Sequence, residues 1–304
     1  CSATRGSSTT SGSRSTARAP FAANSFRKSS MSRPLRSLLA AFAVTAGIVS
    51  SRAAAAQVPT RVVDRNIVLP ANAAELRLDV RLGLSRSAAG DVAIVAPSLS
   101  YGFSDKFTLS ILHTRENYVG DGGSFCVGSD CGSHHYGQVA IDGKYLIYSK
   151  DKASIAIDGA VEGYAFDPFV FGIRGGIAGK VRVSDDLAFL FNPTLFLGIT
   201  NRSSLADSLV LPLRLQFKVD DHFAPFVDTG LYFDGFEGSR NGRIDFYGRP
   251  RGAWRLPVGA GFIYAANTTV DLGLRFAFLG VLNGYNGYGS FDGRELVGSL
   301  ALHF

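Results

Sequence analysis

Residues 75–84 read ELRLDVRLGL and alternate strictly between apolar and polar side chains. One face of an extended chain over this stretch carries Leu76, Leu78, Val80, Leu82 and Leu84, and the other carries Glu75, Arg77, Asp79 and Arg81. Strict alternation of this length indicates a β-strand whose two faces meet different surroundings. One face is therefore expected to contact an apolar phase and the other a polar one.

The same alternation recurs along the rest of the chain. Comparable segments lie near 75–84, 91–102, 106–115, 136–148, 153–165, 172–183, 187–200, 208–219, 223–234, 253–265, 268–280 and 294–304. Most run for about ten residues or slightly more, whereas strands of soluble proteins usually have about five or six. A tilted strand needs roughly nine to eleven residues to cross a bilayer. The segments therefore have the length of membrane-spanning strands.

These features predict an all-β fold, a transmembrane antiparallel up-and-down β-barrel of about twelve strands that covers residues 75–304. Because lipid offers no hydrogen-bond partners, a spanning sheet has to close on itself. The final segment, ELVGSLALHF at 295–304, is expected to pair with the first and complete the ring. Short turns alternate with long loops, so we expect both termini at the short-turn, periplasmic end. A water-soluble sandwich or barrel is the alternative fold.

The final strand also carries a resemblance. Its apolar positions Leu300 and Leu302 and its terminal Phe304 are similar to the last strand of Gram-negative outer-membrane β-barrel proteins, a porin-like class. The resemblance covers residues 75–304 and does not identify a family. It implies a place in the outer membrane among its lipids and lipopolysaccharide. It also implies that the barrel-assembly machinery recognises the strand that ends at Phe304.

The residues before the barrel are read as three parts. Residues 1–30 are interpreted as an upstream extension that is not part of the native protein. Residues 31–56 have a basic start, an apolar stretch at 38–49 and small residues before Gln57, which is the pattern of a signal peptide. An organellar transit peptide is the alternative. Residues 57–74 are predicted to be a periplasmic N-terminal segment.

The net charge of +6 does not indicate a nucleic-acid partner. Eight of the 31 basic residues precede position 57 without any Asp or Glu, which leaves 23 basic against 25 acidic residues in the remainder. A nucleic-acid-binding domain needs a basic patch on the working domain itself. We therefore expect no nucleic acid among the partners.

The polar faces of the strands predict the lining of the lumen, because charges on the lipid face would be strongly unfavourable. The candidate lumen and selectivity residues are Arg174, Lys180, Arg182, Arg214, Lys218, Arg255, Arg275, Asp142, Asp158 and Glu162. Opposed basic and acidic walls would give a passive channel for small polar or anionic solutes. Alternatively, these charges pair off in a filled lumen, and the barrel acts as a structural or surface-recognition protein through its outer loops.

The loop FCVGSDCGSHH at 125–135 contains two closely spaced cysteines. We expect Cys126 and Cys131 to form a disulfide, because the compartment is oxidising. His134 and His135 raise a zinc site as the alternative, but their spacing matches no standard finger. No metal or other cofactor is predicted. His113, near Ser110 and Thr114, is the best catalytic candidate, yet no motif surrounds it, so we do not expect an enzyme.

Overall fold

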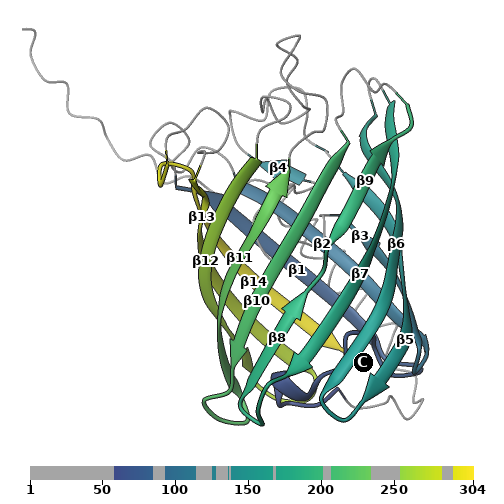
Figure 1. Cartoon of the computed structure of the whole chain (residues 1–304), viewed down its shortest axis with the longest axis vertical. Helices are drawn as coiled ribbons and strands as arrows, with labels where there is room; N and C mark the ends of the chain where they lie inside the picture. The colour runs from purple at the N-terminus through teal and green to yellow at the C-terminus, as the bar shows by residue number, and fades with distance from the viewer. Residues whose placement is uncertain are drawn as a thin grey trace, which may run out of the picture. The chain divides into compact units, whose positions relative to one another are not determined.

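The structure is a computed structural model that describes residues 58–84, 93–113, 125–127, 136, 138–166, 169–200, 207–233, 254–282 and 290–304. The chain divides into two compact units, 1–50 and 51–304, and every described residue belongs to the second. The second unit is a closed antiparallel β-barrel of twelve strands, as the sequence predicts (Figure 1). No helix within the described ranges is long and apolar enough to cross a membrane.

The barrel is built from fourteen strand segments. They are β1 (Ala74–Gly83), β2 (Ala93–Ser104), β3 (Phe107–Leu112), β4 (Phe125–Val127), β5 (Val139–Lys150), β6 (Ala153–Phe166), β7 (Phe169–Arg182), β8 (Leu187–Phe191), β9 (Thr194–Gly198), β10 (Ser208–Phe217), β11 (Phe223–Phe233), β12 (Trp254–Ala265), β13 (Val270–Leu282) and β14 (Arg294–His303). Two positions of the ring are each filled by two segments. Segments β3 and β4 both pair with β2, and β8 and β9 both lie between β7 and β10.

The predicted closure between the last and first strands is confirmed. Strand β14 pairs antiparallel with β1 in an unbroken register that places Leu78 opposite Leu300. The main chain of Phe304 extends this ladder, because its N–H donates to the carbonyl of Ala74 at 2.9 Å and its carbonyl accepts from the N–H of Ala74 at 3.0 Å. Strand β1 also pairs with β2, so both edges of β1 are hydrogen-bonded to a neighbouring strand.

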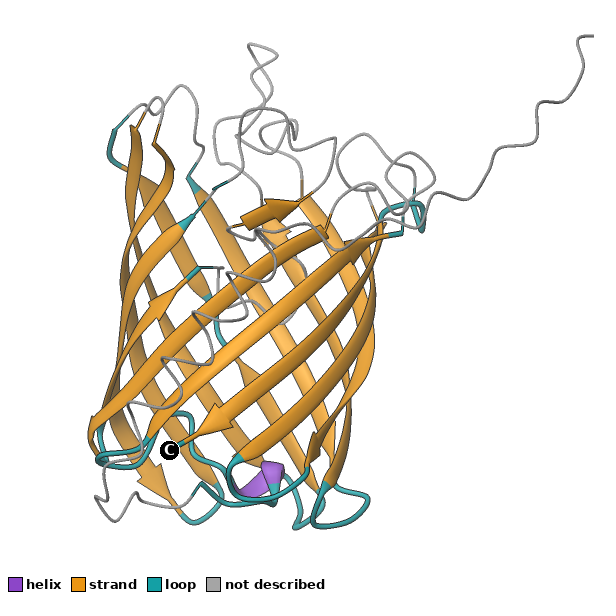
Figure 2. Ribbon diagram, turned by 180° about the vertical axis from the view of Figure 1, so that it is seen from behind, coloured by secondary structure: helices purple, strands orange, loops and turns teal. Residues whose placement is uncertain are grey.

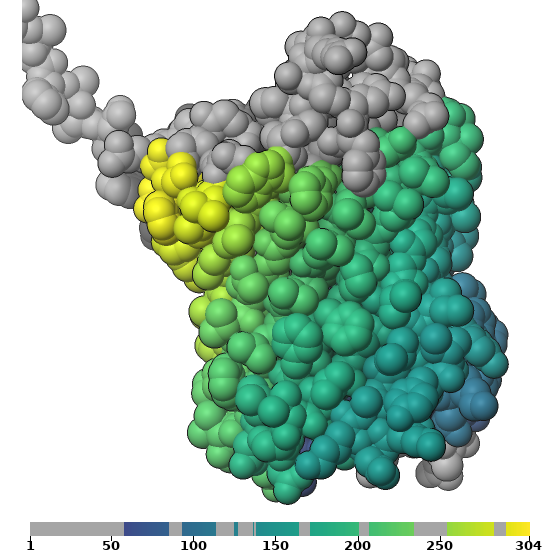
Figure 3. Space-filling view, viewed as in Figure 1, coloured from purple at the N-terminus to yellow at the C-terminus, as the bar shows by residue number. Residues whose placement is uncertain are grey.

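The outer face is apolar, as expected for a surface that meets lipid. Alternate residues on neighbouring strands are solvent-accessible in the isolated chain, including Leu99, Ile111, Ile141, Ile157 and Leu272. The space-filling view shows successive strands covering the visible face without a break (Figure 3). Exposed aromatic residues lie near the short-turn ends of the strands, namely Tyr101, Phe103, Tyr145, Tyr148, Phe217 and Tyr264. Aromatic girdles of this kind are typical at the interfaces of outer-membrane barrels.

The seventh strand position is interrupted, which the sequence analysis did not predict. Segment β8 ends at Phe191 and β9 begins at Thr194, with Asn192 and Pro193 between them. Pro193 has no N–H to donate to a neighbouring strand, so a break in the ladder at this point is expected. The register with both neighbouring strands is the same on either side of the break, so Asn192 keeps its inward-facing place and is buried in the lumen.

Candidate functional site in the lumen

The structure places the predicted polar face of the strands inside the barrel. Asp142 on β5 is 1% exposed, whereas its neighbour Ile141 is 57% exposed on the outer face. Many other charged residues of the described strands are buried in the same way. Buried, inward-facing members are Asp79, Arg81, Asp158, Glu162, Arg174, Lys180, Asp228, Arg255, Asp271, Arg275 and Glu295. The lumen is therefore lined by charge, and the contacts among these residues decide what it can do.

One cluster is centred on Arg174 of β7. Its Nε lies 2.6 Å from Oε1 of Glu162, its Nη1 lies 3.0 Å from Oδ2 of Asp158, and its Nη2 contacts Asp142. Asn192 donates from Nδ2 to the same Asp158 oxygen at 3.0 Å. Arg174 thus sits within the acidic cluster of β5 and β6. Its charge is neutralised there and does not face the lumen as part of a separate basic wall.

A second network runs along the opposite stretch of the ring, from β10 to β14. Arg214 binds Asp228 through Nε at 2.6 Å and Nη2 at 3.1 Å. Arg275 joins that carboxylate at 3.1 Å and binds Glu295 at 3.0 Å. Another predicted residue of this region, Arg255, donates from Nη1 to the carbonyl of Leu279 at 2.9 Å, and its guanidinium lies 4.4 Å from the ring centre of Tyr232.

The segment at 58–73, here named the N-terminal strap, lies inside the short-turn end of the barrel. It contains the 3-10 helix η1 (Val62–Asp64), which Figure 2 shows at the same end as the short turns and the C-terminus. Val62 packs against Ala224 and Ala265, and Val68 packs against Leu146 and Ala156. All four wall residues face inward on strands spread around the ring. The segment predicted only to precede the barrel therefore extends across its mouth.

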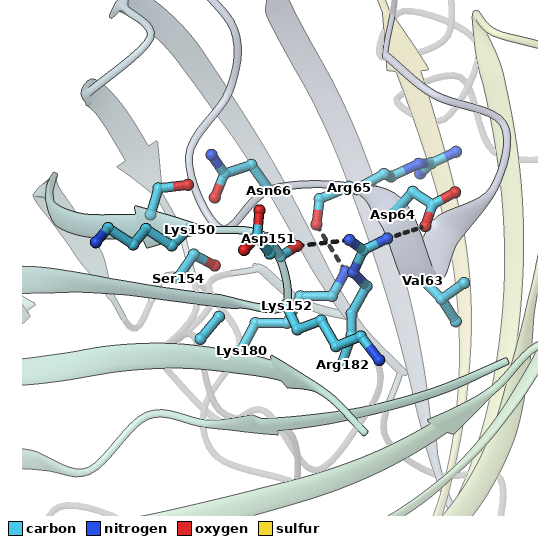
Figure 4. A pocket seen from close by; sticks show the side chains of 12 residues that line it. Val63, Asp64, Arg65, Asn66, Lys150, Asp151, Lys152, Ser154, Lys180 and Arg182 are labelled. Atoms are coloured by element: carbon cyan, nitrogen blue, oxygen red, sulfur yellow. Dashed lines mark hydrogen bonds and ion pairs between the residues drawn. The ribbon is translucent and has the colours of Figure 1, made fainter. Parts of the chain in front are cut away.

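Polar contacts hold the strap to the wall (Figure 4). Lys180 of β7 donates from Nζ to the main-chain carbonyls of Val62 at 3.2 Å and Arg65 at 2.6 Å. Arg182 binds Asp64 at 2.8 Å. Arg65 in turn forms a two-point salt bridge with Asp271 of β13. Two of the predicted selectivity residues, Lys180 and Arg182, thus bind the protein's own strap.

The rim of the short-turn end carries another predicted residue, Lys218. Its Nζ lies 3.0 Å from Oδ1 of Asp221, in the turn before β11. The hydrogen bond from Lys218 lowers the pKa of the Asp221 carboxyl. Arg61 of the strap also approaches this carboxylate, with Nε at 3.5 Å from Oδ1. Lys218 therefore belongs to the rim at the short-turn end of the barrel, away from its middle.

A cavity of about 200 Å³ lies inside the barrel beside the strap, here named the lumen chamber. Its lining residues are Val62, Arg65, Asn66, Ile67, Lys144, Ala178, Lys180, Leu190, Asn192, Arg214, Gln216 and Ile263. Among these described lining residues there are four cations and no carboxylate. A second cavity of about 170 Å³ lies between the strap, the β5–β6 turn and the end of β7, and is shown in Figure 4.

Of the residues that line the chamber, the sequence analysis identified Lys180 and Arg214 as candidate site residues. It missed Arg65, Asn66 and Asn192. The Asn-Pro pair at 192–193 is a turn signal that could have located Asn192. No sequence signal points to Arg65, because the strap lacks a regular period. Arg65 and its partner Asp271 are 206 positions apart in the sequence, so only the folded barrel brings them together.

The other predicted site residues lie elsewhere. His113 contacts the carbonyl oxygen of Pro97 through Nδ1 at 3.0 Å, and Ser110 bonds Ser100 through their hydroxyls at 2.8 Å. Cys126 lies on β4, but Cys131, His134, His135 and Thr114 fall outside the described residues. The Cys126–Cys131 disulfide therefore stays a prediction. The described residues include no group of three or more His, Cys, Asp or Glu placed to hold a metal ion.

Comparison with known proteins supports the fold. No protein-family model matches the chain, and no curated protein matches it in sequence. Among solved structures, the chain is similar to the KdgM porin, with a TM-score of 0.50 and 9% identity over 76% of this chain and 99% of that one. It is also similar to the NanC porin, with a TM-score of 0.51 and 11% identity over 75% and 98%. The chain has the fold of porin-like outer-membrane β-barrels.

The fold and the apolar exterior both indicate where the protein is located. A closed barrel whose outward residues are apolar and whose inward residues are charged is suited to a bilayer and not to water. The protein is therefore an integral β-barrel of the bacterial outer membrane, and membrane lipids surround its exterior.

Proposed function

We propose that this protein is a passive outer-membrane channel for small polar solutes, with a preference for anions. The observation that carries the proposal is the lumen chamber, which exposes Arg65, Lys144, Lys180 and Arg214 to one cavity. Pores select between ions through the charged side chains that line their narrow parts. A surface of four cations attracts an anion and repels a cation.

The preference comes from how the charges are arranged, since the lumen as a whole contains many carboxylates. Arg214 holds Asp228, and Arg65 holds Asp271, with both carboxylates outside the chamber lining. Lys144 of β5 stands opposite Asp158 of β6, and that carboxylate also lies outside the chamber lining. The carboxylates that pair with these cations thus lie outside the chamber lining, which leaves the lining itself basic.

Bore size favours small solutes. Barrels of eight strands are filled by side chains, and barrels of sixteen or more leave wide aqueous channels, so a twelve-strand lumen is intermediate. A chamber of about 200 Å³ holds several water molecules, each of which occupies about 30 Å³ in the liquid. One similar solved structure is the KdgM porin in complex with disordered oligogalacturonate, which is a polyanion. The oligogalacturonate in that complex supports an anionic solute for this chain by analogy of fold alone.

A specific observation favours a second function. The strap and the two ion-pair networks occupy much of the lumen, as they would in a structural barrel that acts through its outer loops. The two functions differ in a liposome-swelling experiment with the purified full chain, a neutral hexose and the corresponding uronate. A channel gives swelling with both sugars, and Lys144→Gln slows entry of the uronate more than that of the hexose. Absence of swelling with the folded full chain and also with a folded variant that lacks residues 58–69 would reject the channel and leave the structural barrel.

A further inference from the structure

We infer that the N-terminal strap, residues 58–73, is a movable plug that closes the periplasmic mouth of the barrel and limits passage through it. This inference rests on the proposed channel function. It assigns the closed state to a segment that precedes the first strand.

The strap reaches around the mouth. On one side, the N–H of Leu69 donates to Oγ1 of Thr108 on β3 at 2.8 Å. On the other side, Arg65 binds Asp271 on β13, and between them Lys180 on β7 holds two strap carbonyls. These anchors lie on strands that are far apart in the ring order. A chain segment tied to all three must cross the opening and cannot lie along a single wall.

The strap is also attached in a way that permits release. Among the described residues, strand pairing with the barrel begins at Ala74, and no ladder includes the strap. Its main chain bonds the main chain of the wall only next to β1, where Asn72 donates to the carbonyl of Gly102 at 2.7 Å and Gly102 donates to that of Ala73 at 2.8 Å. The remaining ties are side-chain contacts. The strap can therefore swing about residues 70–73 without breaking the sheet.

Gly102 of β2 determines how closely the strap approaches the wall at this hinge. A Cβ atom at this position would lie 2.0 Å from the carbonyl oxygen of Pro70 and 2.9 Å from that of Leu69. Both obstructing atoms are main chain, so the strap would have to move to accommodate them. Only glycine permits the closed position that the structure shows.

Displacement of the strap would change the chamber as well as the mouth. Val62, Arg65, Asn66 and Ile67 of the strap form one part of the chamber lining. When the strap leaves, the chamber opens towards the periplasm and loses one of its four cations. Opening should therefore raise the conductance and weaken the anion preference together.

The test is single-channel recording on the full chain extracted from bacterial outer membranes. Two variants perturb the strap without adding a charge to the wall: Gly102→Ala and an internal deletion of residues 58–69. Gly298→Ala is the matched control, because a Cβ atom there meets nothing within 4 Å. Heat-modifiable migration on gels confirms that each barrel is folded before recording.

We expect a higher conductance than wild type for Gly102→Ala and for the deletion, and an unchanged value for Gly298→Ala. If wild type and the folded deletion variant conduct equally, the plug is overturned while the channel stands. If neither conducts, both the channel and the plug are rejected. If only the variants conduct, both are supported, and the strap is the closed gate.

Discussion

Arg65 of the N-terminal strap and Asp271 of β13 form a two-point salt bridge between residues 206 positions apart, in which Nη2 lies 2.9 Å from Oδ1 and Nη1 contacts Oδ2. Both side chains are largely buried, and His303 of β14 supports the same carboxylate through Nε2 at 2.9 Å. This pair joins the segment before the first strand to the far wall of the barrel. It is thus a direct link between the strap and the state of the lumen.

Reversing one member of this pair should open the mouth. We expect Arg65→Asp to raise single-channel conductance, because two carboxylates would then repel where a salt bridge existed. The double variant Arg65→Asp with Asp271→Arg should bring the conductance back towards wild type. A double variant with a higher conductance than the single variant Arg65→Asp would contradict the role of the pair.

Arg174 should be a main determinant of stability. Arg174→Met leaves three buried carboxylates around an uncharged side chain, and loss of one partner from a buried ion pair costs about 3–5 kcal/mol. Urea unfolding in detergent micelles measures this loss. Arg77→Met is the control, because the Arg77 side chain is 46% exposed and its pair with Asp79 is worth less than about 1 kcal/mol. Equal losses for the two variants would contradict the buried cluster.

The effect of a charge on ion selectivity should depend on how deep in the barrel that charge lies. Lys144→Glu reverses a charge in the lumen chamber, whereas Lys218→Glu makes the same change at the rim, where Asp221 is 61% exposed. Lys218 lies outside the chamber lining and its charge is already paired with Asp221, so the rim variant should have the smaller effect. Reversal potentials in a salt gradient compare the two. A larger shift towards cations for Lys218→Glu would place the selective region at the rim.

On the outer face, an aromatic ring covers one glycine of β7. The ring of Phe191 covers Gly179 of β7, and a Cβ atom there would lie 2.1 Å from Cζ. Gly179→Ala should lower the free energy of unfolding by about 1–3 kcal/mol, as overpacking does. Gly175→Ala on the same strand meets nothing within 4 Å and should be close to neutral. Equal stability of the two variants in urea would show that Phe191 moves aside freely.

Much of the fold follows from local pattern. Because side chains on a strand alternate between faces, positions such as Asp142 and Arg174 can be assigned to the lumen from the sequence alone. The pairing of β14 with β1 follows from the requirement that lipid-exposed sheets have no edge. The break between β8 and β9 was not predicted, since the alternation and the register continue through it, and the three-residue segment β4 is too short to give a period.

The contacts within the lumen could not be derived in the same way. Alternation gives the face of a residue but not its height, and only the strand register brings Arg174 level with Asp158 and Glu162. The expectation of separate acidic and basic walls lacked this register. The strap was assigned as a segment before the barrel, because VPTRVVDRNIVLP at 58–70 has neither a strand nor a helix period. Its position depends on shape and charge complementarity with the finished barrel.

The measurement that tests the central claim most directly is the conductance of the refolded full chain in a planar bilayer under a salt gradient. We predict discrete, reproducible steps and a reversal potential displaced to the anion side, because four cations face the lumen chamber. A folded barrel that gives no steps even after removal of residues 58–69, or steps with a cation-sided reversal potential, would contradict the account.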